Sequence, residues 1–294
     1  MQATIQSPAS PAHSAPAARP SMARAAERLV RAGAAGSLEW EGTTLASHFQ
    51  PILSVRDAAC HGYEALLRAA DGERLRVSPA ALFEGAGESR AVLDWACRAL
   101  HLRNYARFEP DERTLFLNVH PQVAAHDAGC AIDLGELVRY YGLLPKRVCV
   151  EISPDDSVDE QALLEAVAIY REMGISIAVD GFGKGRANFD RVIAVHPDVV
   201  KIDRSLFADR MLGWGRARRM LGGVVELLHE ARARVVVSGI ETAAEARVAV
   251  DAGADYVQGF FFCEPDAGPA DEPAAVARLA AILRAGGRRG LFAS

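Results

Sequence analysis

The sequence predicts an α/β protein, and the architecture that fits it best is a TIM-like (β/α)8 barrel. From about Leu45 onward, short apolar runs alternate with longer amphipathic stretches, which is typical of parallel strands joined by crossover helices. About eight such runs fall within roughly 240 residues, the size of a barrel of this kind. A doubly wound open sheet has a similar pattern, so periodicity alone leaves that alternative open.

The individual elements follow from this alternation of short and long segments. The predicted strands are HFQPILSV (48–55), GYEALLR (62–68), RTLFLNV (113–119), KRVCVEIS (146–153), ISIAVD (175–180), DVVKID (198–203), RVVVSG (234–239) and DYVQGFFF (255–262). The predicted helices cover residues 89–108, 159–174, 215–233, 242–253 and 272–286. Each helix has the spacing of apolar residues that one buried face requires.

Composition divides the chain into a tail, a lead-in and one large domain. Residues 1–20 are rich in Ala, Pro and Ser and lack apolar periodicity, so we expect a disordered tail. Residues 21–44 are expected to form an N-terminal helix and a lead-in, and residues 45–288 the barrel domain.

Bulk properties narrow the class of protein. The net charge of −5 gives no argument for direct nucleic-acid binding or for attraction to a membrane surface, and no apolar run is long enough to span a membrane. The five cysteines are scattered and form no Cys-x-x-Cys pair. This spacing argues against a disulfide framework or a zinc–thiolate site and favours a reducing, cytoplasmic location.

Polar residues interrupt the apolar strands at or near their carboxyl ends. They are Glu64, Asn118, Glu151, Asp180, Lys201, Ser238 and Gln258. In a barrel these ends converge on one face, so the residues could form a single cluster. Carboxylate and amide oxygens suit Mg²⁺ or Mn²⁺, and Lys201 could face a phosphate oxygen. Any one of them could instead cap a helix, and His120, a lone histidine nearby, is interpreted as a core or surface residue.

Several separated motifs, in order, resemble the EAL domain of bacterial cyclic di-GMP signalling. They are FQPILSV, GYEALLRA, LFLNV, VEIS, VDGFGKG, VVKIDRSLF, VSGIETAAEA and DYVQGFFFCEP, and they extend from about Leu45 to Pro265. The resemblance implies a barrel whose early strand departs from the parallel pattern. It also implies binding of cyclic di-GMP over the barrel mouth and, in active members, its hydrolysis to pGpG with Mg²⁺ or Mn²⁺.

The resemblance assigns roles to residues of this chain. By motif position, the ligands of a first metal ion are Glu64, Asn118, Glu151 and Asp180. Lys201 matches the lysine near the attacking water, so Lys201 and Glu64 are the expected catalytic residues. Gln50, Arg68 and Gln258 match residues that contact or adjoin the nucleotide.

Other positions depart from the pattern of active members. Gly181 stands where a second consecutive aspartate is usual, and Ser238 where a glutamate precedes Gly239. Both lie where a second metal ion would be held, and neither supplies a carboxylate. Pro154 replaces a glutamate that steadies the following loop, in which Lys184 and Arg186 are also unusual.

These differences leave three functions to compare. We expect a degenerate EAL domain that binds cyclic di-GMP with weak or absent hydrolysis and passes the signal to a protein partner. The first alternative is an active phosphodiesterase in which Asp203 or a nearby acid replaces the missing ligands. The second is a nucleotide-independent interaction module, motivated by Lys184 and Arg186. A homodimer is compatible with all three.

Overall fold

A computed structural model describes residues 36–108, 113–120, 128–153, 159–184, 188–207, 213–268 and 272–287 of the chain. The strands are β1 (Ser37–Trp40), β2 (Thr43–Ser54), β3 (Ala59–Ala70), β4 (Arg76–Val77), β5 (Thr114–Val119), β6 (Val148–Ile152), β7 (Ser176–Phe182), β8 (Val199–Ile202), β9 (Arg234–Val237) and β10 (Tyr256–Val257). The helices are α2 (Pro79–Gly85), α3 (Arg90–Tyr105), α5 (Ala128–Tyr140), α6 (Glu160–Glu172), α7 (Asn188–Val195), α8 (Trp214–Glu230), α9 (Ala243–Asp251) and α10 (Glu272–Gly287). Short 3₁₀ turns are η1 (Gly87–Ser89), η2 (Ala106–Phe108), η3 (Pro145–Arg147) and η4 (Arg204–Leu206).

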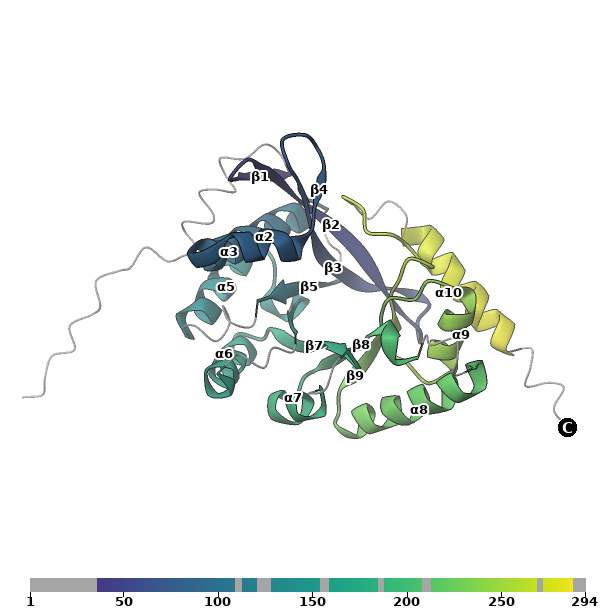
Figure 1. Cartoon of the computed structure of the whole chain (residues 1–294). Helices are drawn as coiled ribbons and strands as arrows, with labels where there is room; N and C mark the ends of the chain where they lie inside the picture. Colours follow the sequence, from purple (N-terminus) through teal and green to yellow (C-terminus); the bar gives the residue numbers. More distant parts are fainter. Residues whose placement is uncertain are drawn as a thin grey trace, which may run out of the picture.

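The sheet closes into an eight-stranded barrel with helices around it (Figure 1). Seven strands follow one another around the barrel, and each is parallel to the next: β3, β5, β6, β7, β8, β9 and β10. Strand β2 is antiparallel to both of its barrel neighbours, β3 and β10. Because β2 pairs on both sides, it joins the two ends of the parallel sheet. The barrel prediction and its irregular early strand are therefore confirmed, and the open sheet is excluded.

The predicted strands all appear, although β10 is limited to two residues of the predicted run 255–262. Sequence analysis did not identify β1, β4, α2, α5 or α7. The predicted tail and most of the predicted lead-in fall within residues 1–35, which lie outside the described residues. No helix in the described ranges combines the length and apolar character needed to cross a membrane.

Side-chain caps fix where several helices begin. Asp159 accepts a hydrogen bond from the backbone N–H of Ala162 at the start of α6. At α9, the Thr242 hydroxyl accepts from the Glu245 N–H while the Glu245 carboxylate accepts from the Thr242 N–H, which is a capping box. These caps satisfy backbone N–H groups that have no partner within the helix.

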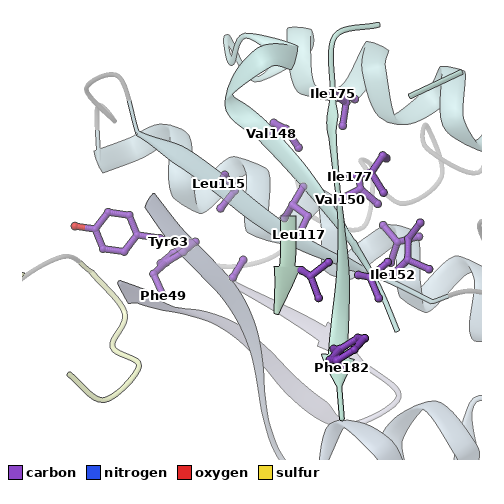
Figure 2. Packing of buried hydrophobic residues seen from close by; sticks show 14 of the residues in the cluster. Phe49, Tyr63, Leu115, Leu117, Val148, Val150, Ile152, Ile175, Ile177 and Phe182 are labelled. Carbon is purple, nitrogen blue, oxygen red and sulfur yellow. The ribbon is translucent and has the colours of Figure 1, made fainter. Parts of the chain in front are cut away.

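The core consists of two layers separated by the strands. Outward-facing strand residues such as Leu115, Leu117 and Val150 pack with buried helix residues in one large cluster (Figure 2). A second cluster lies inside the barrel and takes one residue from each of seven barrel strands. These residues are Ile52, Phe116, Cys149, Ala178, Val199, Val236 and Tyr256, and we call them the apolar layer.

Two histidines packed in this core lose their ordinary basicity. The His61 ring stacks on Tyr256 with a centroid separation of 4.3 Å, and burial, followed by the charge of Arg234, lowers its pKa to about 4. His101 is buried beside the Ser47 hydroxyl, 2.8 Å from its Nδ1, and burial lowers its pKa to about 4 as well. Both rings are therefore neutral in the folded protein at pH 7.

We expect the free energy of unfolding to be highest above pH 6.5 and to fall as the pH is lowered towards 4. Across this window the unfolded chain, whose histidines keep their ordinary pKa of 6.5, binds more protons than the folded chain. The variant His61→Phe retains an aromatic ring against Tyr256 but cannot titrate. Urea unfolding at neutral and acidic pH should show that the pH-dependent loss is about halved in this variant.

The control for this experiment is His196→Asn, which changes an exposed histidine at a positive φ of 47° to a residue that tolerates this conformation. It should leave the pH dependence as in the wild type. If the free energy of unfolding of His61→Phe fell as much on acidification as that of the wild type, His61 would not be a source of the acid sensitivity.

Candidate functional site

A layer of polar side chains lies directly above the apolar layer, towards the carboxyl ends of the parallel strands. Along each strand a polar residue follows the apolar one by two positions, as in Phe116 and Asn118, Cys149 and Glu151, Ala178 and Asp180, Val199 and Lys201, Val236 and Ser238, and Tyr256 and Gln258. On antiparallel β2 the order is reversed, so Gln50 precedes Ile52. Since strand side chains alternate between faces, both members of each pair belong to the inner face.

Strand β3 completes this polar layer with Glu64, two positions after Gly62. A Cβ atom on Gly62 would lie 2.1 Å from the Thr114 carbonyl oxygen, so only glycine allows β3 and β5 to approach so closely. We use the name polar layer for Gln50, Glu64, Asn118, Glu151, Asp180, Lys201, Ser238 and Gln258.

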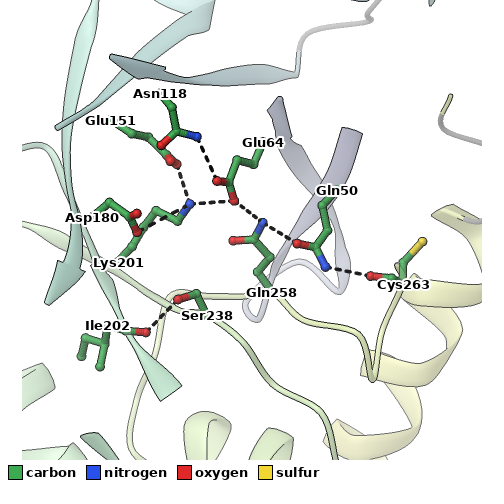
Figure 3. A network of polar contacts seen from close by, with 10 residues as sticks. All are labelled: Gln50, Glu64, Asn118, Glu151, Asp180, Lys201, Ile202, Ser238, Gln258 and Cys263. Carbon is green, nitrogen blue, oxygen red and sulfur yellow. Dashed lines mark hydrogen bonds and ion pairs between the residues drawn. The ribbon is translucent and has the colours of Figure 1, made fainter. Parts of the chain in front are cut away.

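Lys201 lies at the centre of the polar layer (Figure 3). Its Nζ is 2.8 Å from Glu64 Oε2, 2.7 Å from Glu151 Oε1 and 3.9 Å from Asp180 Oδ1. Lys201 is 1% exposed and Glu151 is fully buried, so water cannot screen these charges effectively. The ion pairs therefore hold the ends of β3, β6 and β8 together.

A chain of amide hydrogen bonds positions Glu64 from the other side. Asn118 Nδ2 donates to Glu64 Oε1 over 3.1 Å, and Gln258 Nε2 donates to Glu64 Oε2 over 2.7 Å. Gln258 Nε2 also lies 3.1 Å from Gln50 Oε1, and Gln50 Nε2 donates to the Cys263 carbonyl oxygen over 2.9 Å. Both glutamines are buried, so their amides fix the Glu64 carboxylate in one orientation.

Burial and charge act in opposite directions on the ionisable groups of the layer. Burial opposes the ammonium, but Glu151 and Glu64 outweigh it and raise the pKa of Lys201. For Glu64, burial is outweighed by the charge and hydrogen bond of Lys201, so its pKa is lowered. Burial, reinforced by Glu64, raises the pKa of Glu151 well above its ordinary value. Lys201 thus favours the ionised form of Glu64, whereas burial favours the protonated form of Glu151.

The donor set suits one divalent cation. The carboxylates outnumber the single ammonium, and the buried Glu151 Oε2 has no hydrogen-bond partner within the ranges that the structure describes. Oxygens of Glu64, Glu151 and Asp180, with the Asn118 carbonyl, are the hard ligands that Mg²⁺ or Mn²⁺ prefers. Among the described residues, no three His, Cys, Asp or Glu side chains are already arranged as a metal cage. The Lys201 ammonium lies between the carboxylates of Glu64 and Glu151, so its side chain would have to move for a cation to bind both.

Beside these ligands, Gly181 and Ser238 contribute no carboxylate. Gly181 has no side chain and lies at a positive φ of 69°, where the pairing of β7 with β8 is irregular. The Ser238 hydroxyl donates to the Ile202 carbonyl oxygen over 3.0 Å. Asp203 uses its carboxylate to accept the Ser205 N–H over 2.8 Å, and Glu241 pairs with Arg204 at 2.8 Å. The nearby acids are therefore engaged elsewhere.

A cavity of about 670 Å³ adjoins the polar layer between β3, α2 and α3. Its lining includes the polar side chains of Arg68 and Asn118 together with Pro79, Phe83 and His120. The His120 ring stacks against Phe83 with centroids 6.2 Å apart. The lining thus combines apolar side chains with the Arg68 guanidinium and the polar groups of Asn118 and His120, which suits a ligand that has both apolar and charged groups.

The structure thus brings together Gln50, Glu64, Asn118, Glu151, Asp180, Lys201 and Gln258, while Arg68 lies at the adjoining cavity and Ser238 points to backbone. Sequence analysis did not identify Pro79 or Phe83 as lining residues and did not give His120 a place in the site. The apolar character of Pro79 and Phe83 is indistinguishable from that of core residues in the sequence. Only the fold shows that they face a cavity.

The chain is thus a (β/α)8 barrel protein that assembles its polar site from many strands. Carboxylates, amides and one lysine meet at the carboxyl ends of these strands. The chain belongs to the EAL domain family, whose model matches residues 35–265. The resemblance seen in the sequence motifs is therefore confirmed.

Individual relatives agree with this membership. An uncharacterized protein of Azorhizobium caulinodans is 30% identical over 236 residues, covering 75% of this chain and 31% of the relative. Cyclic di-GMP phosphodiesterase PA2567 of Pseudomonas aeruginosa is 29% identical, covering 74% and 38%. The structure of Klebsiella pneumoniae BlrP1 with manganese and cyclic di-GMP has a TM-score of 0.67 at 23% identity, covering 75% of this chain and 55% of that one. The chain spans about a third of the length of these two curated relatives.

Replacement of the central ammonium should destabilise the fold strongly. Lys201→Met keeps a long side chain but leaves Glu64 and Glu151 buried without their counter-charge, so we expect the free energy of unfolding at pH 7 to fall by about 3 kcal/mol. Urea denaturation measures this loss.

The matched variant is Lys201→Met combined with Glu151→Gln, which removes one of the stranded charges. The double variant should be more stable than the sum of the two single losses predicts, because the two residues act as a pair. Strict additivity of the two losses would count against the ion pair as the organising contact.

Proposed function

We propose that this chain binds cyclic di-GMP at the barrel mouth together with one divalent cation and hydrolyses it slowly or not at all. The observation that carries the proposal is the contrast between two neighbouring positions. Glu64, Glu151 and Asp180 converge on one point. At the adjacent point, Gly181 and Ser238 supply no carboxylate.

This contrast separates binding from chemistry. Rapid phosphodiester hydrolysis at neutral pH is favoured by two cations that share the attacking oxygen and clamp the phosphate. A single Mg²⁺ or Mn²⁺ held by Glu64, Asn118, Glu151 and Asp180 would polarise one phosphate oxygen. We assign Lys201 to balancing the charge of these carboxylates and to facing the phosphate when the cation is bound. The manganese and cyclic di-GMP in the related BlrP1 structure support the choice of cation and ligand.

The ligand contacts are proposed from the residues at the rim. Arg68, which lines the cavity and donates to the Leu67 carbonyl oxygen, is placed to pair with a ligand phosphate. Within the part of the chain that the structure describes, the buried Oε1 of Gln258 has no hydrogen-bond partner, so it is available to a ligand donor or a water. Gln50 acts on the ligand through Gln258 and the Glu64 carboxylate. A protein partner that recognises the ligand-bound barrel would transmit the signal.

An active phosphodiesterase is the second candidate, because relatives such as PA2567 carry that name. The two candidates differ only in turnover, so binding and product formation must be measured on one preparation.

Calorimetry with cyclic di-GMP and Mn²⁺ should give saturable binding, and chromatography of the same mixture should show little pGpG. Arg68→Ala should weaken binding by about tenfold or more, since it removes a charge-assisted contact to phosphate. Arg216→Ala, which changes an exposed arginine on α8, is the control and should bind like the wild type. Absence of binding by the wild type would refute the proposal, and steady pGpG release abolished by Glu64→Ala would establish the active enzyme instead.

Restoring the missing carboxylates should restore turnover. The combination of Gly181→Asp with Ser238→Glu supplies two carboxylates for a second cation. We expect the rate of pGpG formation to rise by about tenfold or more. Aspartate tolerates the positive φ of residue 181 at a cost of about 1 kcal/mol. Each single change should do less, because both ligands serve one ion. If the double variant remains as inactive as the wild type, the loss of hydrolysis has another cause.

A further inference from the structure

The region around Gly181 and Ser238 contains a lysine, Lys184, whose role the proposed function leaves open. It is bounded by the ends of β7, β8 and β9, which are tied together by backbone hydrogen bonds. The Asp203 N–H donates to the Phe182 carbonyl oxygen over 2.8 Å, and the Ser238 N–H donates to the Ile202 carbonyl oxygen over 2.9 Å. Residues near 182, 203 and 238 therefore adjoin one another.

Lys184 projects from a tight turn at this place. Its N–H donates to the Gly181 carbonyl oxygen over 3.0 Å, so the turn starts at the residue that lacks the expected carboxylate. The Lys184 side chain is exposed, and its ammonium interacts electrostatically with Asp203. Two neutral residues, one ammonium and the Asp203 carboxylate are thus the groups present in this region.

The acidic residues of this region already have partners within the protein. Partial burial acts to raise the pKa of Asp203, but the hydrogen bonds from Ser205 and the charges of Lys184 and Arg204 outweigh it and lower the pKa. Its carboxylate is fixed as the cap of η4. Glu241 and Glu245 both pair with Arg204, at 2.8 and 2.9 Å.

We propose that Lys184 takes the place of the second divalent cation and neutralises a phosphate of the bound cyclic dinucleotide. This inference rests on the proposed function and goes further, because it names how the phosphate is held where the acids are missing. A lysine ammonium binds phosphate as a point charge. It cannot hold an attacking water and lower its pKa as a metal ion does, so the same substitution favours binding without cleavage.

The role of Lys184 can be tested by calorimetric titration of cyclic di-GMP in Mg²⁺ at low and high salt. Lys184→Gln should weaken binding by about tenfold at low salt and by less at high salt, because salt screens an exposed charge. Lys184→Arg keeps the charge and should bind close to the wild type, which separates a charge effect from a distorted turn. Lys146→Gln changes an exposed lysine in η3, at the amino end of β6, and should have no effect.

Equilibrium dialysis with Mn²⁺ provides an independent measurement. In the presence of saturating cyclic di-GMP we expect one Mn²⁺ per chain, and two Mn²⁺ per chain would overturn the inference. Equal affinities for the wild type and Lys184→Gln would also overturn it while leaving the proposed function intact. Failure of the wild type to bind would remove the proposed function and this inference together.

Discussion

Lys201 is a buried ammonium between Glu64 and Glu151, and the barrel mouth is organised around it. Without a positive charge at this point, three carboxylates on β3, β6 and β7 would repel one another in a place where water cannot screen them. The amide chain from Gln50 through Gln258 then fixes Glu64 relative to that charge. The result is a preorganised set of oxygens held mainly by strand residues, with Gln258 and the Cys263 carbonyl contributed by the segment after β10.

The regular part of this arrangement could be predicted from the sequence. Apolar strands in a repeating order indicate a parallel sheet with crossover helices, and polar residues at their carboxyl ends indicate one converging site, as Glu151 and Lys201 illustrate. The inward direction of these residues follows from alternation along each strand. Family motifs were needed to choose the closed barrel over the open sheet and to identify β2 as irregular, since closure depends on pairings between residues that are far apart in the chain.

Other features could not be predicted because they depend on three-dimensional neighbours. Strand β4 has only two residues, and α2 buries no residue completely, so neither has a clear apolar period. Phe83 and His120 read as ordinary core or surface residues until the fold places them at one cavity. Similarly, Asp203 is a plausible metal ligand in the sequence, but in the structure its oxygen caps η4.

The two-residue offset between the apolar and polar layers has a consequence for how such a barrel can evolve. A point substitution in the polar layer would change the charge of the barrel mouth without replacing any side chain of the apolar layer beneath it. A single-residue insertion within a strand would instead rotate that strand's upper-layer side chain outward among the helices. Side chains of the polar layer can therefore be exchanged one at a time, whereas a change in strand length would disturb both layers.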